Sequence, residues 1–290
     1  MTWNGAGLLQ RAPAPALVMG AILLTQLGAS LAKEIFDDVG PGGTVFLRLV
    51  FGALILSAVS RPRLGGHERR AWALIVVFGL AFAGMNGAFY ASIERIPLGV
   101  SVTIEFIGPL AVGLVGSRRP LDVVWVALAA AGIVLLGGGV GGGTDLVGVA
   151  LALLAGVFWG AYILLSARVG RRFDDGGEQA LALVVASAVL LPIGVAQGGR
   201  DLLDPTVLVI GLVVAVLASA LPYSFELEAL RRLRPATFGV LMSLEPATAA
   251  LVGAVVLAEA LRTAEWLAVA MVVVASAGAA RSARVLATHE

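Results

Sequence analysis

Two glutamates stand deep inside long apolar stretches, and each comes shortly before a proline. Glu245 directly precedes Pro246, and Glu105 lies four residues before Pro109. A proline inside a helix removes a backbone donor and tends to break the helix, and an ionised group in a lipid core costs a few kcal/mol. At about 1.5 Å per helical residue, Glu245 lies roughly 15 Å along a span that begins at Pro235, near the middle of a bilayer. Such carboxylates could bind an ammonium group or carry a proton, whereas the alternative is a packing kink with a hydrogen-bonded Glu.

Other candidates are less specific. Arg48, in the apolar stretch 44–60, could bind a carboxylate or extend its long side chain to water. Glu226 lies about 3 Å deeper than Glu228, which is expected to pair with Arg231 or Arg232 at helical spacing. Gln26, Ser30 and Trp159 belong to a group of polar and aromatic residues that more often only pack membrane helices together. The candidate set for substrate binding or proton coupling is Glu105, Glu245, Glu226, Arg48, Asn86, Tyr90, Tyr162, Tyr223 and Ser224.

The composition is that of a membrane protein. Of 290 residues, 59% are hydrophobic and 13% are charged, and the mean hydropathy is +0.96, outside the range of soluble domains. The net charge of +1 argues against nucleic-acid binding. There is no cysteine, and the two histidines, His67 and His289, lie outside the apolar stretches. We therefore expect no enzyme activity, no metal and no cofactor.

The apolar stretches predict an all-α integral membrane protein with ten transmembrane helices. The first could also be a signal peptide, but nine further stretches favour an uncleaved first span. The predicted spans are 14–33, 44–60, 71–92, 97–117, 120–139, 145–167, 178–197, 206–230, 235–257 and 263–281.

Positive charge predicts the orientation of these spans. Fifteen of the 20 Lys and Arg residues fall before, between or after the spans on one side, and only Lys33, Arg95, Arg200 and Arg262 fall on the other. Because cytoplasmic loops retain Lys and Arg, both termini are expected in the cytoplasm, which requires an even number of helices.

The two halves of the chain are similar. The glycine-rich segment GGGVGGGTD, residues 137–145, divides a predicted repeat at 1–140 from a second at 141–290, and Pro109 and Pro246 occupy matching places in them. Five spans per half is odd, so the second half would enter the membrane from the opposite side as an inverted repeat, which is typical of carriers. The glycine-rich segment lacks the Lys-Ser/Thr ending of a phosphate-binding loop, so it is expected to be a linker.

Three passages resemble the threonine/homoserine exporter branch of the drug/metabolite transporter superfamily, the EamA family. They are IERIPLGVSVTIEFIGPLAVGLVGSRRP, GASLAKEIF and ALPYSFELEALRRLRPATFGVLMSLEP. The resemblance implies two inverted five-helix halves in a bacterial inner membrane, a central cavity, and proton-driven efflux of threonine, homoserine or similar amino acids. The motifs that match the family lie around Glu105, Tyr223, Ser224, Glu226 and Glu245. The resemblance therefore implies that the surroundings of these residues are shared with the family. The family pattern does not include the three neighbouring acidic residues Glu34, Asp37 and Asp38.

The resulting hypothesis is an exporter of small amino acids, working as a proton antiporter by alternating access in the lipid bilayer. The substrate ammonium would face Glu245 or Glu105, and its carboxylate would face Arg48 or the amides of an interrupted helix. Alternatives are other metabolites, aromatic amino acids or cationic drugs as substrates of the same kind of carrier. A channel or membrane scaffold is the alternative of another class, and no pattern predicts an oligomeric state.

Overall fold

The computed structural model describes residues 12–65, 68–114, 120–137, 145–169, 177–230, 232–233, 238 and 241–286. These residues form helices, and no strand occurs among them. The elements are α2 (Ala14–Lys33), α3 (Phe36–Ser60), α4 (Arg69–Ile93), α5 (Leu98–Glu105), α6 (Ile107–Leu114), α7 (Pro120–Gly137), α8 (Leu146–Val169), α9 (Glu178–Gly198), the short η1 (Asp201–Leu203), α10 (Pro205–Ala215), the π turn η2 (Val216–Ala220), α11 (Leu221–Leu230), α13 (Glu245–Val256) and α14 (Thr263–Leu286).

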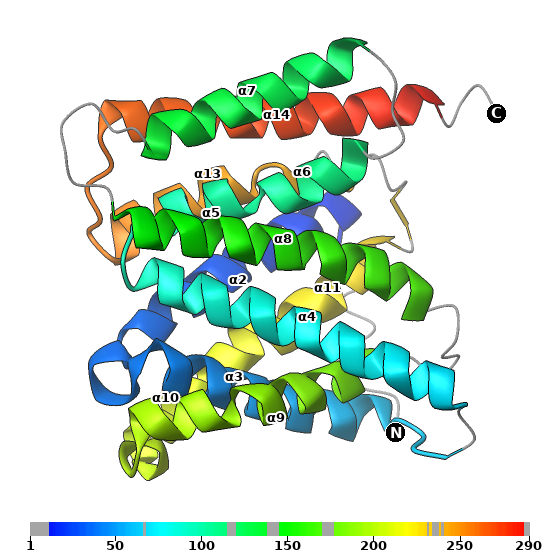
Figure 1. Ribbon diagram of the computed structural model, residues 1–290, viewed down its shortest axis with the longest axis vertical. Coiled ribbons are helices and arrows are strands. Elements are labelled where there is room, and N and C mark those ends of the chain that lie inside the picture. The colour runs from blue at the N-terminus through cyan, green and yellow to red at the C-terminus, as the bar shows by residue number, and fades with distance from the viewer. Residues whose placement is uncertain are drawn as a thin grey trace.

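The helices lie side by side across the molecule. Along the long axis they are stacked from α7 and α14 at one extreme to α9 and α10 at the other (Figure 1). The main packing partners are α3 with α9, α4 with α8 and α9, α2 with α11, α5 with α13, and α7 with α14. Glu105 and Glu245 lie on the pair α5 and α13, in the middle of this stack (Figure 1).

Six helical segments of the described chain are long and apolar enough to cross a membrane. Large apolar side chains such as Leu54, Val157 and Val255 are exposed on the helix surfaces, as expected where lipid is the solvent. The chain is therefore a multi-pass membrane protein, and the predicted all-α class is confirmed. The six segments are Ala14–Lys33, Phe36–Ser60, Arg69–Ile93, Leu146–Leu165, Glu178–Gly198 and Pro205–Glu226, and shorter apolar helices cover Leu98–Val112, Val123–Gly132, Glu245–Val256 and Thr263–Gly278.

The predicted span 44–60 begins too late. Helix α3 starts at Phe36 and is kinked at Gly40, where φ is 66°. The backbone N–H of Gly42 donates to Gln197 Oε1 on α9 at 2.6 Å, which satisfies a donor that the kink leaves free. The run of Asp, Gly and Pro residues has the composition of a loop, but contacts with α9 hold it in a helical path. Arg48 consequently lies well inside its helix, twelve residues after its first residue.

The predicted spans 97–117 and 235–257 are interrupted at the two glutamates. Helix α5 ends at Glu105 and α6 begins at Ile107, while α13 begins at Glu245 after a turn at residues 243–244. Pro246 therefore occupies the first turn of a helix, where a missing N–H is harmless. The interruptions expected from Pro109 and Pro246 are present.

The predicted span 206–230 contains a π turn. Helix α10 passes into η2, whose last residue, Ala220, lies two residues before Pro222. A proline clashes with the carbonyl four residues before it and cannot donate to it, so the regular α-helical pattern is disturbed at this point.

Small residues let several helices approach backbone to backbone. A Cβ atom placed on Gly108 of α6 would lie 2.0 Å from the carbonyl oxygen of Gly156 on α8, and one on Gly99 of α5 would lie 2.4 Å from Ala250 Cα on α13. The Gly156 and Gly160 pair is thus a packing site, as its spacing predicts.

Several residues named or counted above lie outside the described chain. These are most of the glycine-rich linker, at residues 138–144, both histidines, and the basic residues Arg11, Arg118, Arg119, Arg171, Arg172, Arg231 and Arg234.

Candidate functional site

The two glutamates are buried where two packed helices are interrupted. Glu105 is 6% exposed at the last residue of α5, and Glu245 is 7% exposed at the first residue of α13. Glu105 interacts electrostatically with Glu245 and with Arg48, and Glu245 interacts with Glu226 of α11. We call Glu105, Glu245 and Glu226 the acidic cluster. It combines residues from both halves of the chain.

Glu245 has one described side-chain partner. Gln26 Nε2, on α2, donates to Glu245 Oε1 at 3.2 Å. The second carboxylate oxygen, Oε2, is buried without a hydrogen bond, and so is Gln26 Oε1. Buried polar atoms normally have partners, so these two acceptors indicate a position at which a donor belongs.

Arg48 is the cation of the site and does not reach water. Its side chain is 7% exposed, which excludes the snorkelling alternative. Nη1 donates to Asn86 Oδ1 at 2.9 Å and to Tyr90 Oη at 3.4 Å, and the guanidinium carbon lies 5.6 Å from the centre of the Tyr90 ring. Asn86 is itself oriented by a hydrogen bond from Nδ2 to the Phe82 carbonyl at 2.9 Å. The predicted residues Arg48, Asn86 and Tyr90 therefore form one buried unit on α3 and α4.

The remaining donors of Arg48 bind the π turn. Nη2 donates to the Ala218 carbonyl at 2.7 Å, and Nε donates to Ser219 Oγ at 3.3 Å. In an α-helix the Ala218 carbonyl would accept from residue 222, but Pro222 has no N–H. Arg48 supplies the missing donor and so fastens α3 to the segment that leads into Tyr223 and Glu226.

Tyr162, Tyr223 and Ser224 lie around this centre in different ways. Tyr162 is stacked on Phe78 at 5.1 Å between ring centres, and its hydroxyl donates to Gln179 Oε1 at 3.4 Å. Tyr223 is half-buried and interacts electrostatically with Arg48. Ser224 is exposed and donates to the Ala220 carbonyl of its own helix at 2.8 Å. The structure thus brings Tyr223 to the centre and leaves Ser224 at the surface.

Two ion pairs join the first and second halves at one end of the bundle. Lys33 Nζ, at the end of α2, lies 2.6 Å from Glu259 Oε1, in the segment between α13 and α14. The backbone N–H of Leu98, which begins α5, donates to Glu259 Oε2 at 2.8 Å. We call Lys33, Glu259 and Leu98 the end clamp. It ties α2 and α5 to the second half of the chain.

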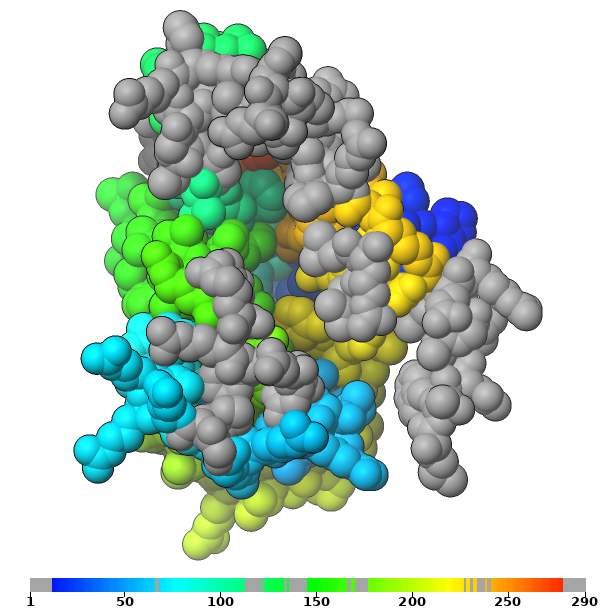
Figure 2. Space-filling view, turned by 90° about the vertical axis from the view of Figure 1, so that its right-hand side faces the viewer, coloured from blue at the N-terminus to red at the C-terminus, as the bar shows by residue number. Residues whose placement is uncertain are grey.

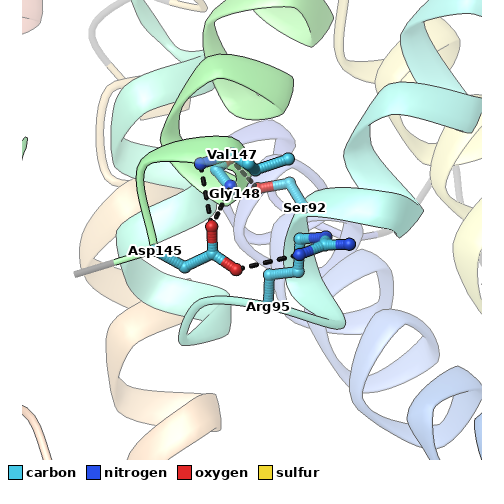
Figure 3. Close-up of polar contacts among 5 residues, drawn as sticks. All are labelled: Ser92, Arg95, Asp145, Val147 and Gly148. Carbon is cyan, nitrogen blue, oxygen red and sulfur yellow. Dashed lines mark hydrogen bonds and ion pairs between the residues drawn. The ribbon is translucent and has the colours of Figure 1, made fainter. Parts of the chain in front are cut away.

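The second ion pair caps α8. Arg95 Nη1 lies 3.0 Å from Asp145 Oδ2, and Asp145 Oδ1 accepts from the backbone N–H of Val147 at 2.8 Å and of Gly148 at 3.2 Å (Figure 3). Ser92 Oγ donates to the Gly148 carbonyl at 2.9 Å (Figure 3). The hydrogen bond from Arg95, followed by those from the backbone, holds the pKa of the exposed Asp145 below its usual value.

The opposite end of the bundle is hollowed. Figure 2 looks onto this end and shows a depression at its centre, between α8 in green and α11 in yellow. At the C-terminal end of α11, Arg232 Nη2 pairs with Glu228 Oε1 one helical turn away, as predicted. Among the described residues, no group of three or more His, Cys, Asp or Glu side chains is arranged to hold a metal ion.

Sequence reasoning understated Gln26 and missed Ser219, Lys33 and Glu259 as parts of the interaction network. A single amide in an apolar helix is no specific signal, and Gln26 meets Glu245 only across 219 positions of sequence. The signal that could have been used for the π turn is Pro222, because it leaves the Ala218 carbonyl without a helical donor.

Known proteins similar to this chain are transporters. The threonine/homoserine exporter RhtA of Salmonella typhimurium is 44% identical over 261 residues, covering 89% of this chain and 88% of that protein. The protein of the same name from Escherichia coli K12 is 42% identical over 271 residues, covering 92% and 91% of the two chains. The chain belongs to the EamA-like transporter family. The family's sequence profile matches residues 146–281.

Two further proteins are similar to this chain at lower identity. The uncharacterized transporter YwfM of Bacillus subtilis is 27% identical over 235 residues, covering 78% of this chain and 79% of that protein. A solved crystal structure that is 21% identical covers 94% of this chain with a TM-score of 0.62. That structure supports the fold alone. Membership of the EamA family makes this chain a transporter rather than an enzyme.

Proposed function

We propose that this chain exports a small zwitterionic amino acid, threonine or homoserine, in exchange for protons. The observation that carries the proposal is the pair of buried glutamates at the breaks of two packed helices, α5 and α13. Carboxylates at such breaks are suited to bind an ammonium group or a proton near the middle of a membrane. Relatives at 42% and 44% identity that bear the name of threonine/homoserine exporters support this choice of substrate.

The architecture that we propose has ten membrane crossings in two inverted halves, 1–140 and 141–290. The helix contacts support this division. If α2, α3 and α4 correspond to α8, α9 and α10–α11, the contact of α4 with α8 has its counterpart in that of α11 with α2. Likewise, the contact of α4 with α9 corresponds to that of α10 with α3. The family profile, at residues 146–281, falls within the second half.

The proposed orientation places the end clamp on the periplasmic side of a bacterial inner membrane and both termini in the cytoplasm. The excess of Lys and Arg in the loops at the other end supports this orientation. The hollow in Figure 2 then opens to the cytoplasm. The amino acid enters there, and its ammonium binds at the acidic cluster while its carboxylate faces the unit of Arg48, Asn86 and Tyr90.

Transport then requires the clamped end to open and the hollowed end to close. A rocking motion of the two halves exposes the acidic cluster to the periplasm, where a proton replaces the amino acid on Glu245 or Glu105. The protonated carrier returns and releases the proton inside. Glu226, which interacts electrostatically with Glu245, is a candidate to pass that proton on.

The test is threonine efflux from loaded proteoliposomes with an imposed proton gradient. Wild-type protein is expected to show efflux that the gradient accelerates, and Glu245→Gln is expected to lose this acceleration because an amide carries no titrating proton. Glu265→Gln is a matched control, since among the described residues the side chain of Glu265 bonds within its own segment, to the N–H and the guanidinium of Arg262. Gradient-driven efflux by Glu245→Gln at the wild-type rate would remove Glu245 from the coupling role.

A second arm of the experiment separates substrates and classes of protein. Unlabelled threonine and homoserine are expected to compete with labelled threonine, whereas phenylalanine and a cationic dye are not. Preloaded threonine should also accelerate the uptake of labelled threonine, since a carrier exchanges its substrate and a channel does not. Equal inhibition by phenylalanine, or absence of exchange, would contradict the proposed function.

A further inference from the structure

Gln26 and Glu245 leave two acceptor oxygens unused at the same place. Their side chains are joined by the bond from Gln26 Nε2 to Glu245 Oε1. Gln26 is 2% exposed and Glu245 is 7% exposed, and both Gln26 Oε1 and Glu245 Oε2 are buried without a hydrogen-bond partner among the described residues. The two unpaired oxygens therefore belong to neighbouring groups at the centre of the carrier.

The chemistry of the missing partner follows from this arrangement. Both free atoms are acceptors, so a single ligand that reaches both must donate two hydrogen bonds. A primary ammonium has three N–H donors and a positive charge, which matches one carboxylate oxygen and one amide oxygen. A carboxylate or phosphate ligand would instead be repelled by both oxygens.

We propose that Gln26 is a specificity-determining residue that accepts a hydrogen bond from the substrate ammonium, beside the free oxygen of Glu245. This inference rests on the proposed function and names how that site recognises its substrate. The Gln26 N–H holds one oxygen of Glu245 and leaves the other for the ligand. Because Gln26 lies on α2 and Glu245 on α13, which pack against each other, the ammonium binds both halves of the carrier.

The same pair explains how a proton and the substrate exclude each other. A protonated Glu245 is neutral and presents an O–H in place of a charged acceptor oxygen. The ammonium then loses the negative charge and one of the acceptors that it needs. Gln26 holds Glu245 through Nε2 and contributes no titrating group of its own.

The variant that tests this is Gln26→Leu, with Ser30→Ala as its matched control. Leucine keeps much of the side-chain volume and removes the amide. Ser30 is also buried and lies one turn further along α2, but its hydroxyl donates to the Leu27 carbonyl of its own helix. Gln26→Leu is expected to raise the KM for threonine by about tenfold, the effect of one lost hydrogen bond to a charged group, with the maximal rate within about twofold of wild type. Ser30→Ala is expected to keep the wild-type KM.

A structural role of Gln26 would give a different pattern. It would lower the maximal rate and the melting temperature of the purified protein together and leave KM unchanged, and that result would overturn the inference. Where Gln26→Leu does not fold, Gln26→Met takes its place, because the flexible methionine side chain adapts to the same space.

A measurement on the wild-type protein tests the inference independently of any variant. Threonine is compared as a competitor with its analogue in which a hydroxyl replaces the amine, and the analogue is expected to compete at least about tenfold more weakly. Equal competition would overturn the ammonium site even where threonine is transported. Absence of threonine and homoserine transport by the wild type would instead contradict the proposed function itself.

Discussion

At the scale of single residues, Arg48 takes over a task that a backbone group normally performs. Pro222 cannot donate to the Ala218 carbonyl, and Arg48 Nη2 donates to it at 2.7 Å. The same guanidinium binds Asn86 and Ser219, so one side chain connects α3, α4 and η2. A cation placed in this way serves the fold and the electrostatics of the site together.

Because Arg48 has both roles, a second substitution at Pro222 is expected to restore part of the stability that is lost when Arg48 is replaced. Arg48→Met leaves buried acceptors without donors and is expected to destabilise the protein by about 1–3 kcal/mol. Adding Pro222→Ala restores a backbone N–H near the Ala218 carbonyl and should recover part of that loss, although transport stays low because the cation is absent. Thermal unfolding in detergent and threonine efflux measure the two effects. Full recovery of efflux in the double variant would show that the charge of Arg48 is dispensable.

Sequence could identify the charged members of the site but not their partners. Glu105, Glu245 and Arg48 stand out because ionisable groups are rare in apolar stretches. Gln26 does not stand out, because isolated amides in membrane helices usually serve packing. Its contact with Glu245 depends on how α2 and α13 are placed, and no local pattern records that.

At the scale of helices, backbone contact near Glu105 positions the acidic cluster. Pro109 leaves the Glu105 carbonyl without its helical donor, and Gly156 of α8 lies so close that an added Cβ would be 2.7 Å from that oxygen. A larger residue at position 156 would therefore push α8 away from the break at Glu105.

Gly108→Ala tests this crossing. Its methyl group would lie 2.0 Å from the Gly156 carbonyl oxygen, so α6 and α8 must separate. We expect a clearly lower melting temperature and loss of most transport. Gly87→Ala is the control, because its nearest neighbour is the flexible end of Leu190 at 3.4 Å, and it should unfold at or slightly above the wild-type temperature. Similar melting temperatures for the two variants would contradict the close crossing.

The cap of α8 predicts a pH dependence. Arg95 and two backbone N–H groups lower the pKa of Asp145, so ionised Asp145 stabilises the folded state. This contribution is fully present above the unfolded pKa of about 3.9 and is lost as the pH falls through the lower folded pKa. Asp145→Asn should therefore lower the melting temperature by a few degrees at pH 7 and by less at pH 3. An equal difference at both pH values would exclude an electrostatic cap.

Helix boundaries were harder to predict than helices. The apolar stretches predicted the existence of the long helices, but residues 36–43 contain Asp, Gly and Pro and have the composition of a loop. They belong to α3 because the Gln197 side chain of α9 accepts a hydrogen bond from the backbone N–H of Gly42. The π turn before Pro222 was also missed, although Pro222 marks the position. The hydrogen bond from Arg48 to the Ala218 carbonyl joins residues 170 positions apart and has no local signal.

At the scale of the whole molecule, the two ends of the bundle differ. At one end, Lys33 with Glu259 and Arg95 with Asp145 join the two halves, whereas the other end is hollowed at its centre (Figure 2). The Lys33–Glu259 pair is partly buried and the Arg95–Asp145 pair is largely exposed, so neither is expected to add much stability. If the two halves rock as proposed, this end can open only when the contacts of the end clamp break.

Accessibility measurements can test the clamp. The chain has no cysteine, so Val102→Cys on α5, buried at 2% exposure, introduces a single thiol. A membrane-impermeant maleimide added outside cells is expected to label it slowly. Adding Glu259→Gln should accelerate labelling several-fold, because Lys33 and Leu98 lose a charged acceptor. Adding Glu265→Gln instead should leave the labelling rate unchanged. An unchanged labelling rate with Glu259→Gln would show that other contacts keep this end closed.

The end clamp also bears on the direction of net flow. With Lys33 and Glu259 facing the periplasm, as proposed, an idle carrier stays sealed toward the medium and presents its acidic cluster to the cell interior. Amino acids diluted in the surroundings then find no site to occupy between export cycles. A cell can thereby keep many copies of the carrier in its membrane without draining or refilling its pool of free amino acids in an uncontrolled way.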